Sequence, residues 1–322
     1  MKVATFRHSG QKSLGIVLGD KIIDLNATRI LMRKHRNQPR ETIPILDMKS
    51  FLARGPAAVR IARQVEAWVK GQVEGNDRVP AAAGRILLDL PKVRLLAPLF
   101  DPPKVLCLAR NYVSHAREVA GDTPLPTSLL IFMKPRTAIT GPGEAVVIPE
   151  SCQKLDHEVE LAVVIGKRGR YIPLERAMDH VAGYTIFNDI SDREYIVQKE
   201  TQRVNWFFMK AQDTFAPLGP YIVLKDEIKD PHSLRLRLWV NGELRQDSSG
   251  EDMIFKIPEI IVQISRFVTL EPGDIIATGT PTGTSFSTKQ YLKGGDVVEC
   301  EIEGIGTLKN SIRVEKEVYR TK

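Results

Sequence analysis

The segment Asp156-His157-Glu158-Val159-Glu160-Leu161-Ala162-Val163-Val164-Ile165 decides both the fold of this chain and its chemistry. Most of it consists of β-branched and aliphatic residues, which predicts a buried strand. Because side chains alternate between the faces of a strand, Glu158 and Glu160 point the same way, with Cα atoms roughly 6.6–6.8 Å apart. They share their face with Ala162 and Val164, where a core-facing strand carries apolar groups. Buried like charges repel each other, and a divalent cation between them would relieve that repulsion.

A third acid supports the same interpretation. Asp189 follows the mostly apolar run 181–187, which predicts a second strand. Taken alone, Glu158 and Glu160 are more typical of a polar strand edge that faces solvent, but the addition of Asp189 reverses that preference. An all-carboxylate set suits Mg²⁺ or Mn²⁺, and also Ca²⁺, better than zinc, which prefers His and Cys ligands.

The composition is that of an ordinary globular protein. The 322 residues are 43% hydrophobic and 26% charged, and the net charge of +7 comes from a basic excess within residues 1–70. No aromatic platform accompanies that excess, so a solvated face is favoured over a nucleic-acid site. We expect no signal peptide, no membrane-spanning segment and no membrane partner. The scattered Cys107, Cys152 and Cys300 favour a reducing cytoplasm over disulfides or a zinc cluster.

The pattern along the chain predicts an α+β fold rich in strands, with a small N-terminal domain over residues 1–90 and a larger catalytic domain over 91–322. The N-terminal part combines short strands within 1–25 with an amphipathic helix near 57–70. A second helix is predicted from an apolar stripe of Ile257, Ile260, Ile261, Ile264, Phe267 and Val268. The clearest strands of the larger domain are 104–108, 129–133, 158–165, 181–188, 221–224, 234–240, 273–277, 296–302 and 311–314.

Several polar residues near the predicted strand ends are candidates for chemistry. If residues 109–118 form a helix, His115 and Glu118 lie on one face, where the acid can orient the imidazole as a general base. A surface ion pair is the simpler reading of that spacing. Three cations adjoin strand ends and suit a substrate carboxylate or a developing oxyanion: Lys134, Arg193 and Lys210. The turn 279–283 offers backbone amides and hydroxyls, or is a plain β-turn.

Taken together in order, these segments resemble the fumarylacetoacetate hydrolase family over roughly residues 103–314. Each motif is weak alone, and the complete ordered series is strong. The motifs are Ala109-Arg110-Asn111-Tyr112 with His115 and Glu118, Lys134-Pro135, Asp156-His157-Glu158-Val159-Glu160-Leu161, Gly183-Tyr184 with Asn188-Asp189 and Arg193, Lys210 with Asp213-Thr214-Phe215, Gly273-Asp274 with Thr278-Gly279-Thr280-Pro281, and Gly304-Ile305-Gly306.

The resemblance implies a mixed β-roll catalytic domain after the small N-terminal domain, commonly as a homodimer. It assigns Mg²⁺ or Mn²⁺ to Glu158, Glu160 and Asp189. In the acylpyruvase-like branch it makes His115 and Glu118 a water-activating dyad, assisted by Lys210. It also implies that Lys210, Arg193 and Thr280 contact the oxygens of the substrate. Arg110, Tyr112 and Lys134 are further candidates for substrate binding.

The chain departs from the family pattern at several positions that bear on substrate identity. Ala109 and Met209 replace common glycines, and Ser285-Phe286 replaces the usual Val-Gly. Ile196 stands where similar acylpyruvases often carry a substrate-contacting Gln. The metal triad and the dyad are intact, so these departures concern the choice of substrate.

The leading hypothesis is a metal-dependent hydrolase that cleaves a carbon–carbon bond in a 1,3-dioxo acid such as an acylpyruvate or fumarylpyruvate. The metal would chelate the 2-oxo acid end and hold the charge of an enolate, while His115 activates water. Two alternatives use the same site: decarboxylation of oxaloacetate-type acids, and isomerisation or hydration of 2-oxo-dienoates. A non-enzymatic binding protein that uses the basic N-terminal face is the remote alternative.

Overall fold

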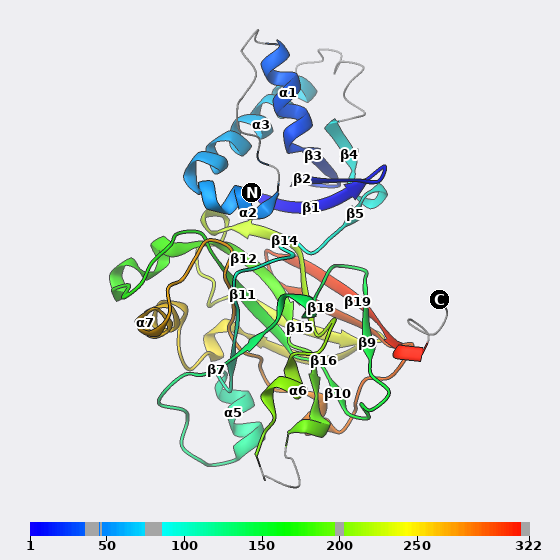
Figure 1. The fold of residues 1–322 in the computed structure, drawn as a ribbon, viewed down its shortest axis with the longest axis vertical. Coiled ribbons are helices and arrows are strands. Elements are labelled where there is room, and N and C mark those ends of the chain that lie inside the picture. Colours follow the sequence, from blue (N-terminus) through cyan, green and yellow to red (C-terminus); the bar gives the residue numbers. More distant parts are fainter. Residues whose placement is uncertain (36–44, 46, 75–85, 197–202, 317–322) are drawn as a thin grey trace.

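The computed structural model describes residues 1–35, 45, 47–74, 86–196 and 203–316. Within them, one sheet of twelve strands runs through both parts of the protein (Figure 1). Its N-terminal strands are β1 (Lys2–His8), β2 (Gln11–Leu18), β3 (Lys21–Asp24), β4 (Leu87–Asp89) and β5 (Arg94–Leu95). Its other strands are β6 (Val105–Ala109), β7 (Leu130–Lys134), β8 (Ile139–Thr140), β11 (Val159–Ile165), β12 (Val181–Asn188), β14 (Ala216–Leu224) and β17 (Ile275–Ala277). The order is β4-β3-β2-β1-β14-β12-β11-β17-β6-β7, with β5 beside β1 and β8 beside β14.

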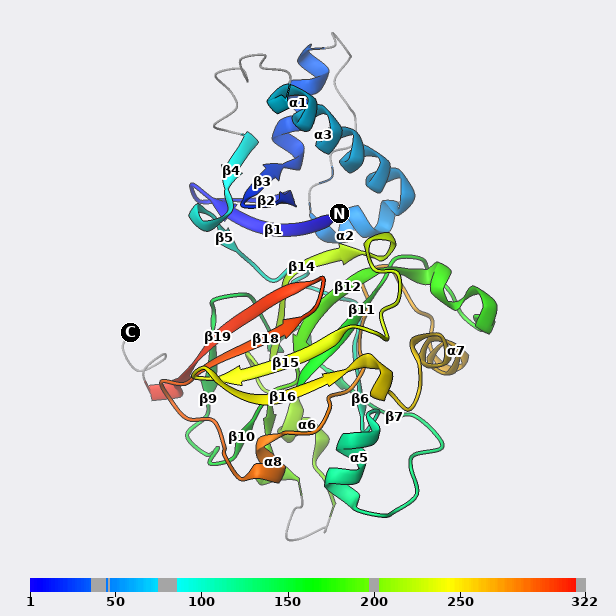
Figure 2. The ribbon, with the colours of Figure 1, turned by 180° about the vertical axis from the view of Figure 1, so that it is seen from behind.

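A second sheet packs against the centre of the first. Its strands, in spatial order, are β16 (Glu243–Ser249), β15 (Arg235–Val240), β18 (Val297–Ile302), β19 (Gly306–Val314) and β9 (Ala145–Ile148). Figure 2 shows these strands lying across the region of β11 and β12. A short pair, β10 (Leu155–Asp156) with β13 (Ser191–Asp192), lies beside the ends of the two central strands. This two-layer arrangement is the strand-rich α+β fold that the sequence predicts.

The side chains of β11 alternate between two hydrophobic clusters. Val159, Leu161, Val163 and Ile165 belong to the cluster under the second sheet, which also contains the buried face of α7 (Ile257–Phe267). Ala162 and Val164 belong to the cluster on the opposite face, together with residues of the N-terminal part. Because period-two alternation is strict, Glu158 and Glu160 point to that opposite face, as the sequence predicts.

The N-terminal part continues the main sheet of the protein. Strand β1 pairs with β14, where Lys2 lies opposite Val223, and the two parts share one hydrophobic cluster. The helices of this part are α1 (Leu25–His35), α2 (Met48–Arg54) and α3 (Pro56–Glu74), which lie together at the end of the molecule distant from α5 (Val113–Ala120) (Figure 1). The boundary near residue 90 stays a prediction, since the sheet passes across it. Part of the basic stretch, residues 36–40, lies outside the described residues.

Most predicted elements are present within a few residues of their expected limits, but some details were wrong. The predicted strands 221–224 and 311–314 are only the last parts of β14 and β19. The apolar stripe predicted from Ile257 to Val268 was too long. Helix α7 ends at Phe267, whose side chain is 80% exposed, and Val268 lies beyond the helix. Seven of the described strands were not predicted: β4, β5, β8, β9, β10, β13 and β16. Among the described helices, none is long and apolar enough to cross a membrane.

The close approach of β12 and β14 yields a first prediction. A Cβ atom at Gly183 would lie 2.2 Å from the carbonyl oxygen of Val223, so the strands must separate to admit alanine. We expect Gly183→Ala to lower the free energy of unfolding by about 1–3 kcal/mol, measured by denaturant titration. Gly71 in α3 has no atom within 4 Å of its Cβ position, so Gly71→Ala is the matched control and should stabilise by about 0.5–1 kcal/mol. Equal effects of the two variants would contradict this account of the strand contact.

Candidate active site

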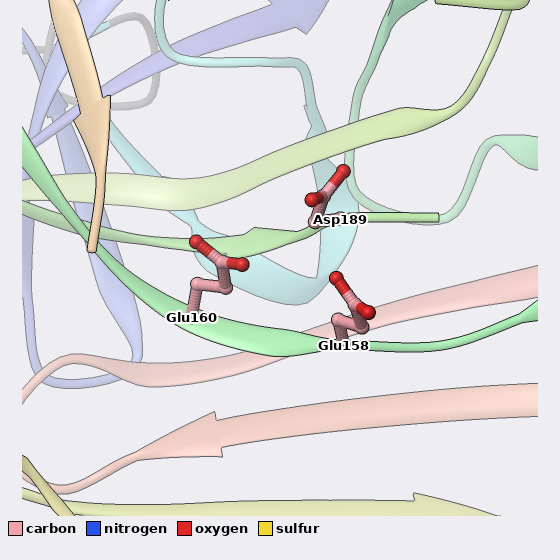
Figure 3. A group of neighbouring side chains, drawn as sticks. All are labelled: Glu158, Glu160 and Asp189. Atoms are coloured by element: carbon pink, nitrogen blue, oxygen red, sulfur yellow. The ribbon is translucent and has the colours of Figure 1, made fainter. Parts of the chain in front are cut away.

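Three buried carboxylates meet where β11 and β12 lie side by side. Val159 pairs with Asn188 and Glu160 with Phe187, and the backbone N–H of Asp189 donates to the carbonyl of Glu158 at 2.9 Å. This register places Asp189 beside the two glutamates (Figure 3). One oxygen from each carboxylate lies within 4.8 Å of the others, and the three residues are at most 5% exposed. The sequence-predicted triad is therefore assembled in space.

Buried cations surround two of the three carboxylates. The Lys210 ammonium, on α6 (Trp206–Lys210), lies 2.7 Å from Glu158 Oε2 and 2.6 Å from Asp189 Oδ2. Arg193 forms ion pairs with Glu158 and, through Nε at 2.8 Å, with Asp156. Burial by itself raises the pKa of Glu158, but the charges of Lys210 and Arg193 outweigh it and lower that pKa to about 2.

Glu160 has a different environment. Its Oε2 accepts a hydrogen bond from the backbone N–H of Gly279 at 2.8 Å, while Oε1 is buried and has no hydrogen-bond partner among the described residues. Burial, together with the negative charges of Asp189 and Glu158, raises its pKa well above the usual range. An unpartnered buried oxygen beside two other carboxylates fits a hard divalent cation held by Glu158, Glu160 and Asp189.

His115 and Glu118 lie on one face of helix α5 as predicted, although the helix begins at Val113 and residues 109–112 are not helical. His115 Nδ1 lies 3.1 Å from Glu118 Oε2, which leaves His115 Nε2 as the ring nitrogen available to a substrate. The other carboxylate oxygen, Oε1, accepts from the Thr282 hydroxyl at 2.7 Å and from the Gly283 N–H at 2.9 Å. Burial raises the pKa of Glu118, but these hydrogen bonds outweigh it and lower the pKa, so the acid stays ionised beside the imidazole.

A small cavity of about 80 Å³ joins the dyad to the triad. Eight of the eleven candidate metal, catalytic and substrate-binding residues line it: Arg110, His115, Glu158, Glu160, Asp189, Arg193, Lys210 and Thr280. Its remaining wall is largely apolar and includes Phe132, Ile196, Val204, Trp206, Met209 and Phe286. Ligand sites for drug-sized molecules have volumes of about 300–1,000 Å³, so this cavity suits a small substrate.

Two expected substrate contacts lie away from the cavity lining. Lys134 is 2% exposed, sits 2.7 Å from Asp189 Oδ1, and donates to the carbonyls of Ile190 and Phe215. Tyr112 is fully buried at the start of α5, where it pairs with Met253. In this geometry Lys134 supports Asp189 from behind, and Tyr112 anchors the dyad helix. Their direct contact with substrate stays a prediction.

The sequence reading missed two polar residues that organise the site. Asp156 was quoted only as part of a motif, yet its carboxylate is fully buried and accepts from Arg193 and from the backbone N–H groups of Ser285 and Phe286. Gln246 is the buried residue of β16, a strand too polar to be recognised from its pattern. A lone Gln in a sequence does not indicate a functional site. The position of Asp156, two residues before Glu158, could have marked it as a member of the site.

The fold and the site together define an enzyme class. A buried carboxylate triad that suits a divalent cation faces a His–Glu pair across a small cavity with cationic side chains. Such an arrangement suits proton transfer on a small anionic substrate.

Comparison with known proteins identifies the family within this class of enzymes. The sequence model of the fumarylacetoacetate (FAA) hydrolase C-terminal family matches residues 104–313. The mitochondrial oxaloacetate tautomerase fahd2 of Xenopus laevis is 39% identical over 97% of this chain and 90% of its own length. Oxaloacetate tautomerase YisK of Bacillus subtilis is 40% identical over 97% of this chain and 100% of its own. The structure of maleylpyruvate hydrolase from Sphingobium sp. SYK-6, in complex with manganese (II) ion and pyruvate, superposes with a TM-score of 0.68, at 29% identity, over 98% of this chain and 99% of that one.

The chain therefore belongs to the fumarylacetoacetate hydrolase family, and it is an enzyme of that family. The resemblance drawn from the ordered motifs is confirmed, as is the strand-rich α+β fold.

The environment of Glu160 predicts how the protein responds to a metal. We expect Mn²⁺ at about 100 times its Kd to stabilise the protein by about 2.7 kcal/mol, which raises Tm by roughly 4 °C. Glu160→Gln should abolish most of this shift without lowering Tm in chelator-treated buffer, because it removes a buried, repelled carboxylate. Differential scanning calorimetry with and without Mn²⁺ measures both effects.

Glu66→Gln is the control for this experiment, since Glu66 forms a surface ion pair with Lys70 on α3. It should retain the full Mn²⁺ shift. A Glu160→Gln protein that also retains the full shift would show that the metal does not bind to the triad.

Proposed function

We propose that this protein is a divalent-metal-dependent oxaloacetate tautomerase, which interconverts the keto and enol forms of a small 2-oxo acid. The observation that carries this proposal is the His115–Glu118 pair, which faces the triad across a cavity of about 80 Å³. The two oxaloacetate tautomerases that match nearly the whole chain support the choice of substrate.

The reaction needs one proton to change position. His115 Nε2 takes a proton from C3 of the keto acid, and return of that proton to the 2-oxygen gives the enol, with no atom gained or lost. Glu118 holds the imidazole through Nδ1 and stabilises its positive charge after the transfer. When bound, the metal supplies Lewis-acid stabilisation of negative charge on the 2-oxo acid.

The residues around the triad determine how the substrate is held. Lys210 and Arg193 line the cavity and already contact Glu158, so an anionic substrate meets positive charge on the same side as the metal ligands. Thr280 lines the same cavity, and Arg110 lines it with an exposed side chain. These cations suit the carboxylates of a dicarboxylic 2-oxo acid.

Mg²⁺ or Mn²⁺ is the proposed cofactor, with Ca²⁺ as a weaker candidate. The three oxygen ligands are of the hard type that these ions prefer. The manganese complex of the maleylpyruvate hydrolase supports the choice of a divalent ion.

Hydrolysis of a carbon–carbon bond in an acylpyruvate or fumarylpyruvate is the second candidate. The same His115 can deprotonate a water molecule, and the similarity to a maleylpyruvate hydrolase favours this reaction. The apolar Ile196 on the cavity wall provides no hydrogen bond to a distal oxyanion, which places hydrolysis second. Decarboxylation of oxaloacetate and isomerisation of 2-oxo-dienoates need no attacking water and use the same acids.

The proposal also covers the cellular compartment of the enzyme and its binding partners. The three cysteines are buried and free, which supports a reducing compartment such as the cytoplasm. We also propose a homodimer, as the family resemblance implies, with a small 2-oxo acid as substrate and neither nucleic acid nor membrane as partner.

The proposed reaction is tested by following the enol form of oxaloacetate spectroscopically with Mg²⁺ or Mn²⁺ present. Loss of the general base should lower kcat for His115→Gln by about 10²–10⁴-fold, and Glu118→Gln should lower it in the same direction because it disturbs the imidazole. Thermal unfolding of each variant checks that the fold is intact. Wild-type kcat in His115→Gln would remove the dyad from the mechanism.

Product identity separates the candidate reactions. Tautomerisation releases nothing, decarboxylation of oxaloacetate releases CO₂ and pyruvate, and hydrolysis of an acylpyruvate releases pyruvate and a second carboxylic acid. We expect the purified enzyme with Mn²⁺ to equilibrate the two forms of oxaloacetate much faster than it releases pyruvate from oxaloacetate or an acylpyruvate. Release of pyruvate from an acylpyruvate at the greater kcat/KM would make the protein a hydrolase instead.

A further inference from the structure

A buried glutamine connects the two halves of the site. Gln246 is 1% exposed, although it lies on the otherwise polar and mostly accessible strand β16. The pairing of β15 and β16 shifts between Leu238 and Trp239: Leu238 lies opposite Gln246, and Trp239 lies opposite Leu244. Arg245 is therefore the extra residue of a β-bulge. Bulges change the direction of neighbouring side chains, and this one directs the Gln246 amide toward the start of β11.

The amide of Gln246 holds the backbone between two metal-ligand candidates. Its Oε1 accepts from the N–H of Val159 at 3.0 Å, and its Nε2 donates to the Thr280 hydroxyl at 3.0 Å. The Thr280 hydroxyl in turn donates to the carbonyl of Val159 at 2.9 Å. These three hydrogen bonds form a closed ring, so both backbone polar groups of the residue between Glu158 and Glu160 are fixed.

The same amide holds the turn that orients the dyad. Gln246 Nε2 lies 2.9 Å from the carbonyl oxygen of Pro281 and 3.3 Å from that of Thr282. The Thr282 hydroxyl and the Gly283 N–H both donate to Glu118. Gly283 fits there because it has no side chain: a Cβ atom would lie 2.1 Å from the carbonyl oxygen of the bulge residue, Arg245.

The orientation of the amide follows from its partners. The Val159 group is a donor, whereas the Pro281 and Thr282 groups are carbonyl acceptors, so only one assignment of Oε1 and Nε2 satisfies them. One side chain thus fixes the ligand strand through its acceptor and the dyad turn through its donors.

We propose that Gln246 is a positioning residue that keeps the carboxylates of Glu158 and Glu160 in register with the His115–Glu118 dyad. It touches neither metal nor substrate directly. Partners of this kind, one shell behind the ligands, commonly change metal affinity or activity by 10- to 100-fold when replaced. The activity part of this inference rests on the proposed tautomerase function, and the metal part does not.

The test uses Gln246→Met, which keeps the length of the side chain and removes all its hydrogen bonds. We expect the Kd for Mn²⁺ alone, measured without substrate by electron paramagnetic resonance, to rise about 10-fold. At saturating Mn²⁺ and oxaloacetate, kcat should fall about 10- to 100-fold. Ser248→Ala, on the same strand, is the control and should change neither value.

A second variant keeps the inference testable if Gln246→Met does not fold. Gln246→Glu retains an acceptor for the Val159 N–H but loses the donors to Thr280 and Pro281. It should therefore bind Mn²⁺ more tightly than Gln246→Met does, while kcat falls at least 10-fold. This split between metal affinity and kcat would not arise from a residue that only contributes to stability.

A double-variant measurement identifies the group through which Gln246 acts. In a His115→Gln background the effect of Gln246→Met on kcat should shrink to less than about threefold, while its effect on the Mn²⁺ Kd remains. Wild-type Mn²⁺ affinity in folded Gln246→Met, or wild-type kcat in Gln246→Glu, would overturn the proposal. If the wild type itself does not act on oxaloacetate, the proposed function fails, and the Mn²⁺ affinities still decide the role of Gln246.

Discussion

The repulsion between buried carboxylates is the constraint on which the rest of the structure depends. Glu158, Glu160 and Asp189 present oxygens within 4.8 Å of one another in a nearly dry environment, and Asp156 adds a fourth acid close by. Three buried cations face these four acids: Lys134, Arg193 and Lys210. The four acids outnumber the three cations by one, and burial together with the charges of Asp189 and Glu158 raises the pKa of Glu160, the acid that forms no ion pair among the described residues. A divalent cation would give the cluster one net positive charge, which suits an anionic 2-oxo acid.

The fold holds these charges in place through strand alternation and register. One face of β11 is apolar and supports the second sheet, which leaves the other face to carry the glutamates beside Ala162 and Val164. This part of the site could be predicted from the sequence because period-two alternation is local and strict. The dyad was predictable for the same reason, since the spacing of His115 and Glu118 needs only one helix.

The contacts between distant segments could not be predicted in the same way. Lys134 is the last residue of strand β7 and Lys210 the last residue of helix α6, yet only Lys210 reaches the cavity, because β7 places Lys134 behind Asp189. Strand β16 was missed because its exposed face and its bulge remove the alternation that marks a strand. The apolar stripe was predicted too long because Phe267 and Val268 continue the apolar pattern of the sequence, whereas the buried face of α7 ends at Ser265.

The choice among reactions depends on the apolar wall of the cavity. The lining combines the carboxylates and cations with apolar side chains, among them Phe132, Ile196, Trp206 and Met209. The rings of Phe132 and Trp206 stack with centroids 5.2 Å apart, which gives that wall a fixed shape. A cation and a small 2-oxo acid in so small a space leave little room for an additional, correctly placed water molecule. Proton transfer needs no such water, whereas hydrolysis does, so the apolar part of the lining favours the proposed enolisation over bond cleavage on the same set of acids.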